Sequence, residues 1–277
     1  MNTTQFAWLA SYPKSGNTWV RLMLSSLLHG GKEPDINAMD LSASILSHAH
    51  LQSCYGVESG DLMPTEIDAV RPQLYRALAE SSDEKLLLSK VHDCCGINAA
   101  GERYFSPEIS RGAVCIVRDP RDVAVSWSHF FGTSVDKAIE VMADENTTLA
   151  GTGKRLHTQL SQHLSSWSKH VLSWLDDAAM PVLLLRYEDM LVDPIGALVK
   201  IADFLGLPSD CAAAAAEATS FEKLRSQEDQ HGFKERTNVC DKFFRKGTSG
   251  EGKRVLTEEQ RARIESDHGR VMARLGY

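Results

Sequence analysis

A lysine, a glycine and several hydroxyl side chains follow the first apolar segment of the chain, in the run Ser11-Tyr12-Pro13-Lys14-Ser15-Gly16-Asn17-Thr18-Trp19. This run lies between a predicted strand over residues 6–12 and an apolar stripe over residues 19–28 that predicts a helix. The first turn of a helix presents unpaired backbone N–H groups, and a glycine lets the backbone approach a phosphate closely. We therefore expect the run to bind an anion. It differs from the nucleoside triphosphate loop GxxxxGK[ST], because Lys14 precedes Gly16 and no earlier glycine has the required spacing.

A second polar run also follows a predicted strand, Val117-Arg118-Asp119-Pro120-Arg121-Asp122-Val123-Ala124-Val125-Ser126-Trp127. Arg118 leaves the strand at its carboxyl end, the edge where open α/β sheets collect their ligands. Ser126 follows about two helical turns later. A guanidinium group with a nearby hydroxyl suits a phosphate monoester, although the charges of this run, taken alone, could also form a surface network.

The segment from Lys234 to Arg254 is basic within an acidic chain, with seven basic and three acidic side chains and glycines at 247, 250 and 252. We interpret residues of about 228–254 as a mobile basic loop that closes over an anion. A solvated surface loop is the alternative if this segment is taken alone.

Strand and helix patterns alternate along the chain. Four short apolar segments predict buried strands at residues 6–12, 86–89, 113–117 and 182–187. Helical patterns cover residues 19–28, 122–131, 160–175, 195–205 and 258–275, and the alanine run 212–216 is also expected to be helical. Apolar runs of this kind suit a parallel sheet that is covered on both faces. The alternation predicts an α/β fold, with residues 1–277 forming a single doubly wound domain around a central parallel sheet.

The overall charge excludes some classes of protein. The 277 residues include 30 Lys and Arg and 37 Asp and Glu, a net charge of −7, whereas general binders of nucleic acid or anionic membranes carry a basic surplus. No apolar run approaches the roughly 20 residues that cross a bilayer, and residues 1–9 lack the features of a signal peptide. We expect a cytoplasmic protein that binds neither nucleic acid nor membranes.

The six cysteines lack disulfide spacing, so we expect free thiols in a reducing compartment. Cys94 and Cys95 lie close to His92, but these three residues lack the paired spacing and the fourth ligand of a structural zinc site. Clustered carboxylates of the kind that hold magnesium in phosphotransferases are absent near the Lys14 run. We therefore expect a reaction that requires no metal.

These runs in combination resemble the cytosolic-type sulfotransferases, which use 3′-phosphoadenosine 5′-phosphosulfate (PAPS) as sulfuryl donor and release 3′-phosphoadenosine 5′-phosphate (PAP). The matching elements occur in the family's order and span residues 6 to about 257. They are the 5′-phosphosulfate loop Tyr12–Trp19, the 3′-phosphate segment Arg118–Ser126, Arg186-Tyr187-Glu188-Asp189-Met190, Thr219-Ser220-Phe221 and Arg245-Lys246-Gly247. The loop makes the first strand, loop and helix P-loop-like, and the start of the chain is similar to bacterial sulfotransferases that modify small molecules.

By position, the resemblance implies a role for each matching residue. Lys14 would contact the bridging oxygen and the sulfonate, and His92, in Lys90-Val91-His92, would be the general base. The 5′-phosphate end would be held by Ser15, Gly16, Asn17, Thr18 and Trp19. The 3′-phosphate would be held by Arg118, Ser126, Arg245, Lys246 and Gly247. The adenosine would be positioned by Trp19, Tyr187, Thr219 and Phe221. The predicted catalytic residues are His92, Lys14 and Ser126.

The implied chemistry agrees with these residue types. Transfer of SO₃ from one oxygen to another leaves negative charge on the departing phosphate oxygen, which the ammonium group of Lys14 can offset. The acceptor loses a proton, and an imidazole such as that of His92 can take it near neutral pH. The sequence thus predicts sulfuryl transfer from PAPS to a hydroxyl group, or an amine, of a small-molecule acceptor.

Two other functions stay open at this point. A nucleotide-dependent phosphotransferase is one, because Gly247-Thr248-Ser249-Gly250-Glu251-Gly252-Lys253-Arg254 nearly fits GxxxxGK[ST], although Arg254 cannot supply the hydroxyl that holds magnesium. A protein that binds adenosine bisphosphate without catalysis is the other. Gly250-Glu251-Gly252-Lys253 also departs from the family's Gly-Asp-Trp-Lys, so how the basic loop closes without that tryptophan is open.

The acceptor and the oligomeric state are left undetermined. We expect residues 30–83 and 132–155 to supply an acceptor pocket that is partly apolar. The candidate lining residues are Leu46, His48, His50, Tyr55, Phe131 and Met142. The family's C-terminal dimer pattern is met at Lys253 and Thr257 but not at Glu258, so it does not predict a dimer.

Overall fold

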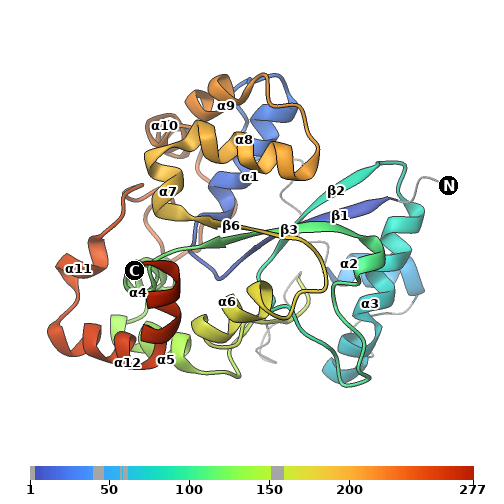
Figure 1. The fold of residues 1–277 in the computed structure, drawn as a ribbon, viewed down its shortest axis with the longest axis horizontal. Coiled ribbons are helices and arrows are strands. Elements are labelled where there is room, and N and C mark those ends of the chain that lie inside the picture. Colours follow the sequence, from blue (N-terminus) through green and yellow to red (C-terminus); the bar gives the residue numbers. More distant parts are fainter. Residues whose placement is uncertain (1–3, 40–46, 57, 59–61, 151–158) are drawn as a thin grey trace.

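A computed structural model describes residues 4–39, 47–56, 58, 62–150 and 159–277. Its centre is a parallel sheet in the order β2-β1-β3-β6 (Figure 1). The strands are β1 (Gln5–Ser11), β2 (Leu86–Val91), β3 (Ser110–Val117) and β6 (Val182–Arg186). All four lie where the apolar segments predict them, so the α/β fold with a central parallel sheet is confirmed.

Alternate residues of β1 pack into two different cores. Phe6 and Trp8 face a core that contains residues of α3 (Pro64–Ser81), α4 (Pro120–Phe131), α6 (Trp167–Leu175) and α12 (Glu258–Leu275). Ala7 and Leu9 face a core built with α1 (Asn17–Leu28), α8 (Pro194–Leu205) and α9 (Ala212–Ala218). Figure 1 shows these helices in two layers, one on each side of the sheet. Because both faces of the sheet are covered, its strands are mostly apolar, which is the pattern that made them recognisable in the sequence.

The strand order creates the position for a ligand. From β1 the chain passes to β2 on one side, and from β2 it returns past β1 to β3 on the other side. In the register of the sheet, Ala10 lies opposite Val91 and Ser11 lies opposite Ile116. The segments that follow β1, β2 and β3 therefore leave the sheet at one edge, and the crevice at such a switch in strand order is where doubly wound folds bind their ligands.

The helices mostly agree with the sequence patterns. The alanine run lies in a helix as predicted, and the helices α2, α3, α5, α7, α10 and α11 had not been predicted. The first five helices are α1 (Asn17–Leu28), α2 (His48–Tyr55), α3 (Pro64–Ser81), α4 (Pro120–Phe131) and α5 (Val135–Ala143). The remaining helices are α6 (Trp167–Leu175), α7 (Tyr187–Val192), α8 (Pro194–Leu205), α9 (Ala212–Ala218), α10 (Phe221–His231), α11 (Glu251–Val255) and α12 (Glu258–Leu275).

The helix predicted over residues 160–175 is shorter than expected. Its first residues instead form β5 (Gln162–His163), which pairs with β4 (Thr148–Leu149) in a small antiparallel sheet. Ser166 then caps α6, because its hydroxyl accepts a hydrogen bond from the backbone N–H of Lys169. Pairing with a distant segment thus overrides the helical pattern at the start of this stretch.

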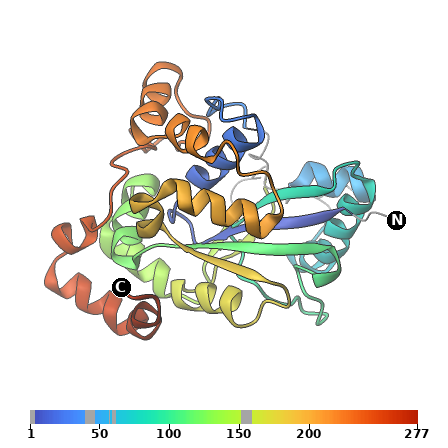
Figure 2. The same cartoon turned by 45° about the horizontal axis from the view of Figure 1, so that its top comes forward.

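The basic segment predicted over residues 228–254 is not one continuous loop. Residues 228–231 end α10, and residues 251–254 belong to α11. Between them the chain has no regular structure and passes from the layer of α1, α8 and α9 to the side of α4 and α12 (Figures 1 and 2). We call residues 232–250 the basic connection.

Among the described residues, none of the helices combines the length and the apolar character needed to cross a bilayer.

Candidate active site

The turn between β1 and α1 has the backbone of an anion-binding loop. Lys14 and Gly16 have φ angles of +71° and +106°, and Gly16 is the N-cap of α1. The side-chain amide nitrogen of Asn17 donates to the carbonyl oxygen of Leu9 at 2.8 Å and to the hydroxyl of Ser11 at 3.2 Å, which fixes the turn to the strand. The N-terminus of α1 is thereby directed at the space beyond the carboxyl edge of the sheet, where an anion would interact favourably with it.

The aromatic ring of Tyr187 requires a glycine at position 16. A Cβ atom there would lie 2.7 Å from Cδ2 of Tyr187. Because the φ angle also disfavours an L side chain, we expect Gly16→Ala to lower the free energy of unfolding by about 1–3 kcal/mol. Urea denaturation would measure the loss. Gly101→Ala is the matched control, since Gly101 has a φ of +82° with no atom within 4 Å of its added Cβ. Equal losses in the two variants would contradict a role for the Tyr187 contact.

Lys14 directs its ammonium group into a largely aromatic environment. Its Nζ atom lies 3.7 Å from the ring centroid of Phe130, on α4, and 4.3 Å from that of Phe243, on the basic connection. Burial lowers the pKa of Lys14 to about 7, and the nearby cations Arg118 and Lys90 contribute to this shift. A half-buried cation that faces rings rather than a hydrogen-bonded carboxylate is suited to receive an anionic ligand.

His92 directly follows β2, and its hydrogen bonds define its tautomer. Nδ1 lies 2.7 Å from the carbonyl oxygen of Ser11, and because a carbonyl oxygen only accepts, Nδ1 carries the proton. Nε2 is therefore the basic atom of the neutral ring. Burial lowers the pKa of His92 well below its ordinary value, the charge of Lys90 adds to the shift, and the hydrogen bond to Ser11 opposes it. The imidazole is neutral at physiological pH and can accept a proton.

Arg118 follows β3 and lies between the Lys14 turn and the basic connection. Its guanidinium donates to the carbonyl oxygens of Lys14 at 3.2 Å and Thr248 at 3.0 Å, and it stacks over the ring of Tyr187 at 4.3 Å. Its Nε atom is buried and has no hydrogen-bond partner among the described residues. Ser126, on α4, lines the same space. An unpartnered buried donor beside a hydroxyl is what a phosphate site requires.

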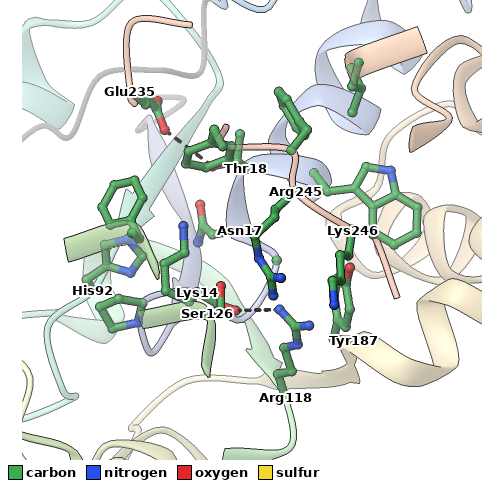
Figure 3. A pocket seen from close by; sticks show the side chains of 18 of the residues that line it. Lys14, Asn17, Thr18, His92, Arg118, Ser126, Tyr187, Glu235, Arg245 and Lys246 are labelled. Atoms are coloured by element: carbon green, nitrogen blue, oxygen red, sulfur yellow. Dashed lines mark hydrogen bonds between the residues drawn. The ribbon is translucent and has the colours of Figure 1, made fainter. Parts of the chain in front are cut away.

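Arg245 and Lys246 bring two further cations to this position. Figure 3 shows the guanidinium group of Arg245 directed toward that of Arg118, with Lys246 beside Tyr187. Both side chains are paired with the carboxylate of Glu251 on α11, Lys246 at 2.6 Å. The cations predicted for the 3′-phosphate therefore converge, and they converge on a carboxylate that the sequence had not indicated.

An aromatic slot lines the same cavity as the two anion-binding positions. Trp19 and Tyr187 meet edge to face, with ring centroids 6.0 Å apart, and Phe221 lines the same cavity. A Cβ atom on Gly247 would lie 2.3 Å from the ring of Phe221, so only glycine lets the basic connection pass this ring. Flat apolar walls of this kind suit a nucleobase.

One cavity of about 640 Å³ brings most of the predicted site residues together (Figure 3). It is lined by Lys14, Gly16, Asn17, Thr18, Trp19, His92, Arg118, Ser126, Tyr187, Phe221, Arg245, Lys246 and Gly247. Two predicted residues do not line it. Ser15 is buried with its hydroxyl unpartnered among the described residues, and Thr219 lies behind Trp19, accepting a hydrogen bond from the indole N–H at 3.0 Å through its carbonyl oxygen. Thr219 therefore contacts the cavity only through Trp19.

Few of the described residues predicted for the acceptor pocket line this cavity. Phe131 lines the cavity, together with Leu149, but the described residues of 30–83 do not. The side chain of Met142 is part of the core, which is the more frequent place for an apolar residue. Three other described candidates do not line the cavity, namely His48, His50 and Tyr55. Leu46 and residues 151–155 lie outside the described residues.

The remaining cavity wall near His92 combines aromatic and amide side chains. It is formed by Phe130, Phe131, Leu149, Gln159 and Gln162. The amide oxygen of Gln162 accepts a hydrogen bond from the backbone N–H of His92 at 3.3 Å. Among the described residues, these side chains come from α4, the small antiparallel sheet and Gln159 rather than from the segment before β2.

Glu235 is a cavity residue to which the sequence had assigned no role. Its carboxylate accepts two hydrogen bonds from Arg21, at 2.8 and 3.2 Å, and lies 3.8 Å from Nζ of Lys90. Figure 3 shows it beside Thr18, whose hydroxyl is 3.4 Å away. These contacts tie the basic connection to α1 and β2. The sequence does not indicate these contacts, because Glu235 lies far along the chain from Arg21 and Lys90.

The triphosphate-loop reading of residues 247–254 disagrees with the structure. No strand leads directly into Gly247, and the N–H groups of Gly250 and Gly252 already donate to the carboxylate of Asp122, at 2.7 and 2.6 Å. These donors are therefore not available to cradle a phosphate. Within the described ranges, no group of three or more His, Cys, Asp or Glu side chains is arranged to hold a metal ion.

Comparisons with known proteins identify the family of this chain. A family model described as a sulfotransferase domain matches residues 5–276. Rat Sulfotransferase 1A1 is 27% identical over 274 residues, covering 95% of this chain and 83% of the relative. The flavonol 3-sulfotransferase of Flaveria bidentis is 28% identical over 279 residues, covering 93% of this chain and 78% of the relative.

Solved structures share the fold. Mouse sulfotransferase SULT7A1 complexed with PAP has a TM-score of 0.58 at 21% identity, covering 97% of this chain and 85% of the other. Retinol dehydratase in complex with androsterone and PAP has a TM-score of 0.59 at 19% identity, covering 96% of this chain and 80% of the other. Since the family model spans nearly the whole sequence, this chain belongs to the family of PAPS-dependent sulfotransferases.

Proposed function

We propose that this enzyme transfers the sulfuryl group of PAPS to a hydroxyl group, or an amine, of a small-molecule acceptor, and that residues 1–277 act as one catalytic domain. The observation that carries the proposal is a single cavity with two separate anion-binding positions and a neutral imidazole. The Lys14 turn is one position, Arg118 with Arg245 and Lys246 is the other, and His92 lies on the same cavity wall. A nucleotide with phosphates at both its 5′ and 3′ positions fits this arrangement.

Relatives support the choice of ligands. The mouse sulfotransferase and retinol dehydratase structures hold PAP, the nucleotide that remains after sulfuryl transfer. Androsterone, retinol and a flavonol, which are named for these relatives, are hydroxylated small molecules with large apolar parts. The wall of Phe130, Phe131 and Leu149 near His92 suits an acceptor of this class.

In the proposed reaction, His92 and Lys14 act at opposite ends of the transferred group. Nε2 of His92 takes the proton of the acceptor while the acceptor oxygen forms a bond to sulfur. The bond between sulfur and the bridging phosphate oxygen breaks, and the ammonium group of Lys14 stabilises the charge that develops on that oxygen. The hydrogen bond from Nδ1 to the carbonyl oxygen of Ser11 leaves Nε2 as the ring nitrogen that can take this proton.

The remaining site residues hold the nucleotide in the proposed complex. The N-terminus of α1, with Gly16, Asn17, Thr18 and the buried hydroxyl of Ser15, faces the 5′-phosphate. The 3′-phosphate lies with Arg118, Ser126, Arg245 and Lys246, and the adenine lies in the aromatic slot. Ser126 contributes to catalysis only by fixing the nucleotide, since no contact places its hydroxyl at His92.

The depressed pKa of Lys14 predicts how PAP binding depends on pH. A lysine with a pKa of about 7 is partly neutral in the free protein at neutral pH, and the protonated form binds the phosphate. Binding therefore takes up a proton, and PAP affinity falls as the pH rises from about 6 to about 8, in the direction set by linkage. Calorimetry in buffers of different ionisation enthalpy measures this uptake. Proton release on binding would contradict the assignment of Lys14.

The test of the proposed function is sulfuryl transfer itself. The purified protein is incubated with PAPS and a panel of phenols, aliphatic alcohols and amines, and mass spectrometry detects acceptors that gain a sulfonate. The proposal predicts a sulfonated product and an equal amount of PAP. Tight binding of PAP with no product from any acceptor class would favour a non-catalytic adenosine bisphosphate-binding protein instead.

A further inference from the structure

The carboxylate of Glu251 forms ion pairs with two cations of the proposed 3′-phosphate position, Arg245 and Lys246. Its Oε1 accepts hydrogen bonds from Arg245 at 3.0 Å and from Lys246 at 2.6 Å, and its Oε2 is paired with the other terminal nitrogen of Arg245. The side chain of Glu251 is only 6% exposed, and Glu251 lines the same cavity as Arg118. Both carboxylate oxygens are thus used by the groups that are proposed to bind phosphate.

The backbone holds Glu251 in this place. The residues on either side of it, Gly250 and Gly252, donate their N–H groups to the carboxylate of Asp122 on α4. A Cβ atom on Gly252 would lie 2.4 Å from the carbonyl carbon of Arg121, so the turn is also packed closely against α4. An anchored turn with an inward carboxylate differs from an ion pair on a solvated surface, which has little geometric constraint.

The charges at this position explain what the carboxylate does. Arg118, Arg245 and Lys246 face two carboxylates, those of Asp122 and Glu251, which leaves one net positive charge. Burial raises the pKa of Glu251, but the hydrogen bonds from Arg245 and Lys246 outweigh it and bring the pKa to about 2. Glu251 is therefore anionic throughout the physiological range and competes with a phosphate for the same donors.

We propose that Glu251 is a specificity-determining residue of the nucleotide site, which limits how strongly the site favours ligands with a 3′-phosphate. Such a ligand must displace the carboxylate from Arg245 and Lys246, whereas a nucleotide without a 3′-phosphate leaves the pairing intact. The inference rests on the proposed function and deepens it. By the same competition, Glu251 also sets the affinity for PAP, the product whose release each turnover requires.

The experiment compares two nucleotides and two variants by calorimetry. In Glu251→Gln the amide keeps the shape of the side chain but removes its charge. We expect this variant to bind PAP about 10-fold more tightly, because the phosphate no longer displaces a charged competitor. Its affinity for adenosine 5′-monophosphate, which lacks the 3′-phosphate, should not change. Glu140→Gln is the control for net charge, since Glu140 is 55% exposed in a pair with Lys137 on α5, away from the cavity.

Each outcome decides the inference. Unchanged or weaker PAP binding by Glu251→Gln would overturn it, because Glu251 would then orient the cations rather than compete for them. Equal gains for PAP and adenosine 5′-monophosphate would also overturn it. If Glu251→Gln does not fold, Glu251→Asp, whose shorter side chain cannot reach both cations equally, should show a smaller gain for PAP alone, and no gain would overturn the inference. Absence of PAP binding by the unaltered protein would contradict the proposed function first.

Discussion

Replacing Lys14 by alanine is expected to lower both kcat and the affinity for PAP, the largest combined loss of any single substitution in this site. The ammonium group faces the phosphate in the ground state as well as the charge that builds on the bridging oxygen. Removing a group that stabilises such a charge typically lowers kcat by about 10²- to 10³-fold. The lost charged hydrogen bond should also weaken PAP binding by about 1.5–3 kcal/mol.

Steady-state kinetics and calorimetry together test this prediction. Lys137→Ala is the control, because Lys137 is 60% exposed and lies outside the cavity, so its loss should change neither quantity. Lys14 already has a positive φ as a non-glycine residue, so alanine should adopt the same backbone conformation. Thermal unfolding of the variant should therefore show that the turn still folds. A Lys14→Ala enzyme with normal turnover would remove Lys14 from the mechanism.

His92→Ala is expected to separate catalysis from nucleotide binding. The imidazole accepts a proton only as the acceptor oxygen attacks, so its loss should lower kcat by about 10²- to 10⁴-fold. PAP affinity should stay within about twofold, because the neutral ring offers no charge to the phosphates. His231→Ala is the control, since its ring is exposed at the end of α10 and does not line the cavity. A parallel loss of PAP affinity would indicate that His92 binds nucleotide rather than acting as a base.

Much of the fold and of the nucleotide site could be predicted from the sequence because they depend on local patterns. The buried strands are continuous apolar runs, and Lys14, His92 and Arg118 follow them directly. In a parallel sheet the carboxyl ends of neighbouring strands share one edge, so residues far apart in the chain are brought together by a rule that needs only the order of the elements. The resemblance to sulfotransferases added the roles that these positions would have.

The parts that could not be predicted depend on contacts between distant segments. Glu235 and Glu251 looked like minor acidic residues of a basic stretch, and only the fold places them against Arg21 and Arg245. The early start predicted for α6 failed for the same reason, since residues 162–163 pair with residues 148–149. The assignment of residues 30–83 to the acceptor pocket used their place in the sequence alone, which does not indicate which way their side chains point.

The most direct test of the proposed site is a crystal structure of the protein with PAP. We predict the 5′-phosphate at the N-terminus of α1 beside Lys14, the 3′-phosphate between Arg118 and Arg245, and the adenine against Trp19. Nε2 of His92 should face the open side of the 5′-phosphate, where sulfur would be transferred. A nucleotide bound in the reverse orientation or outside this cavity, or an imidazole turned away from the 5′-phosphate, would contradict the account.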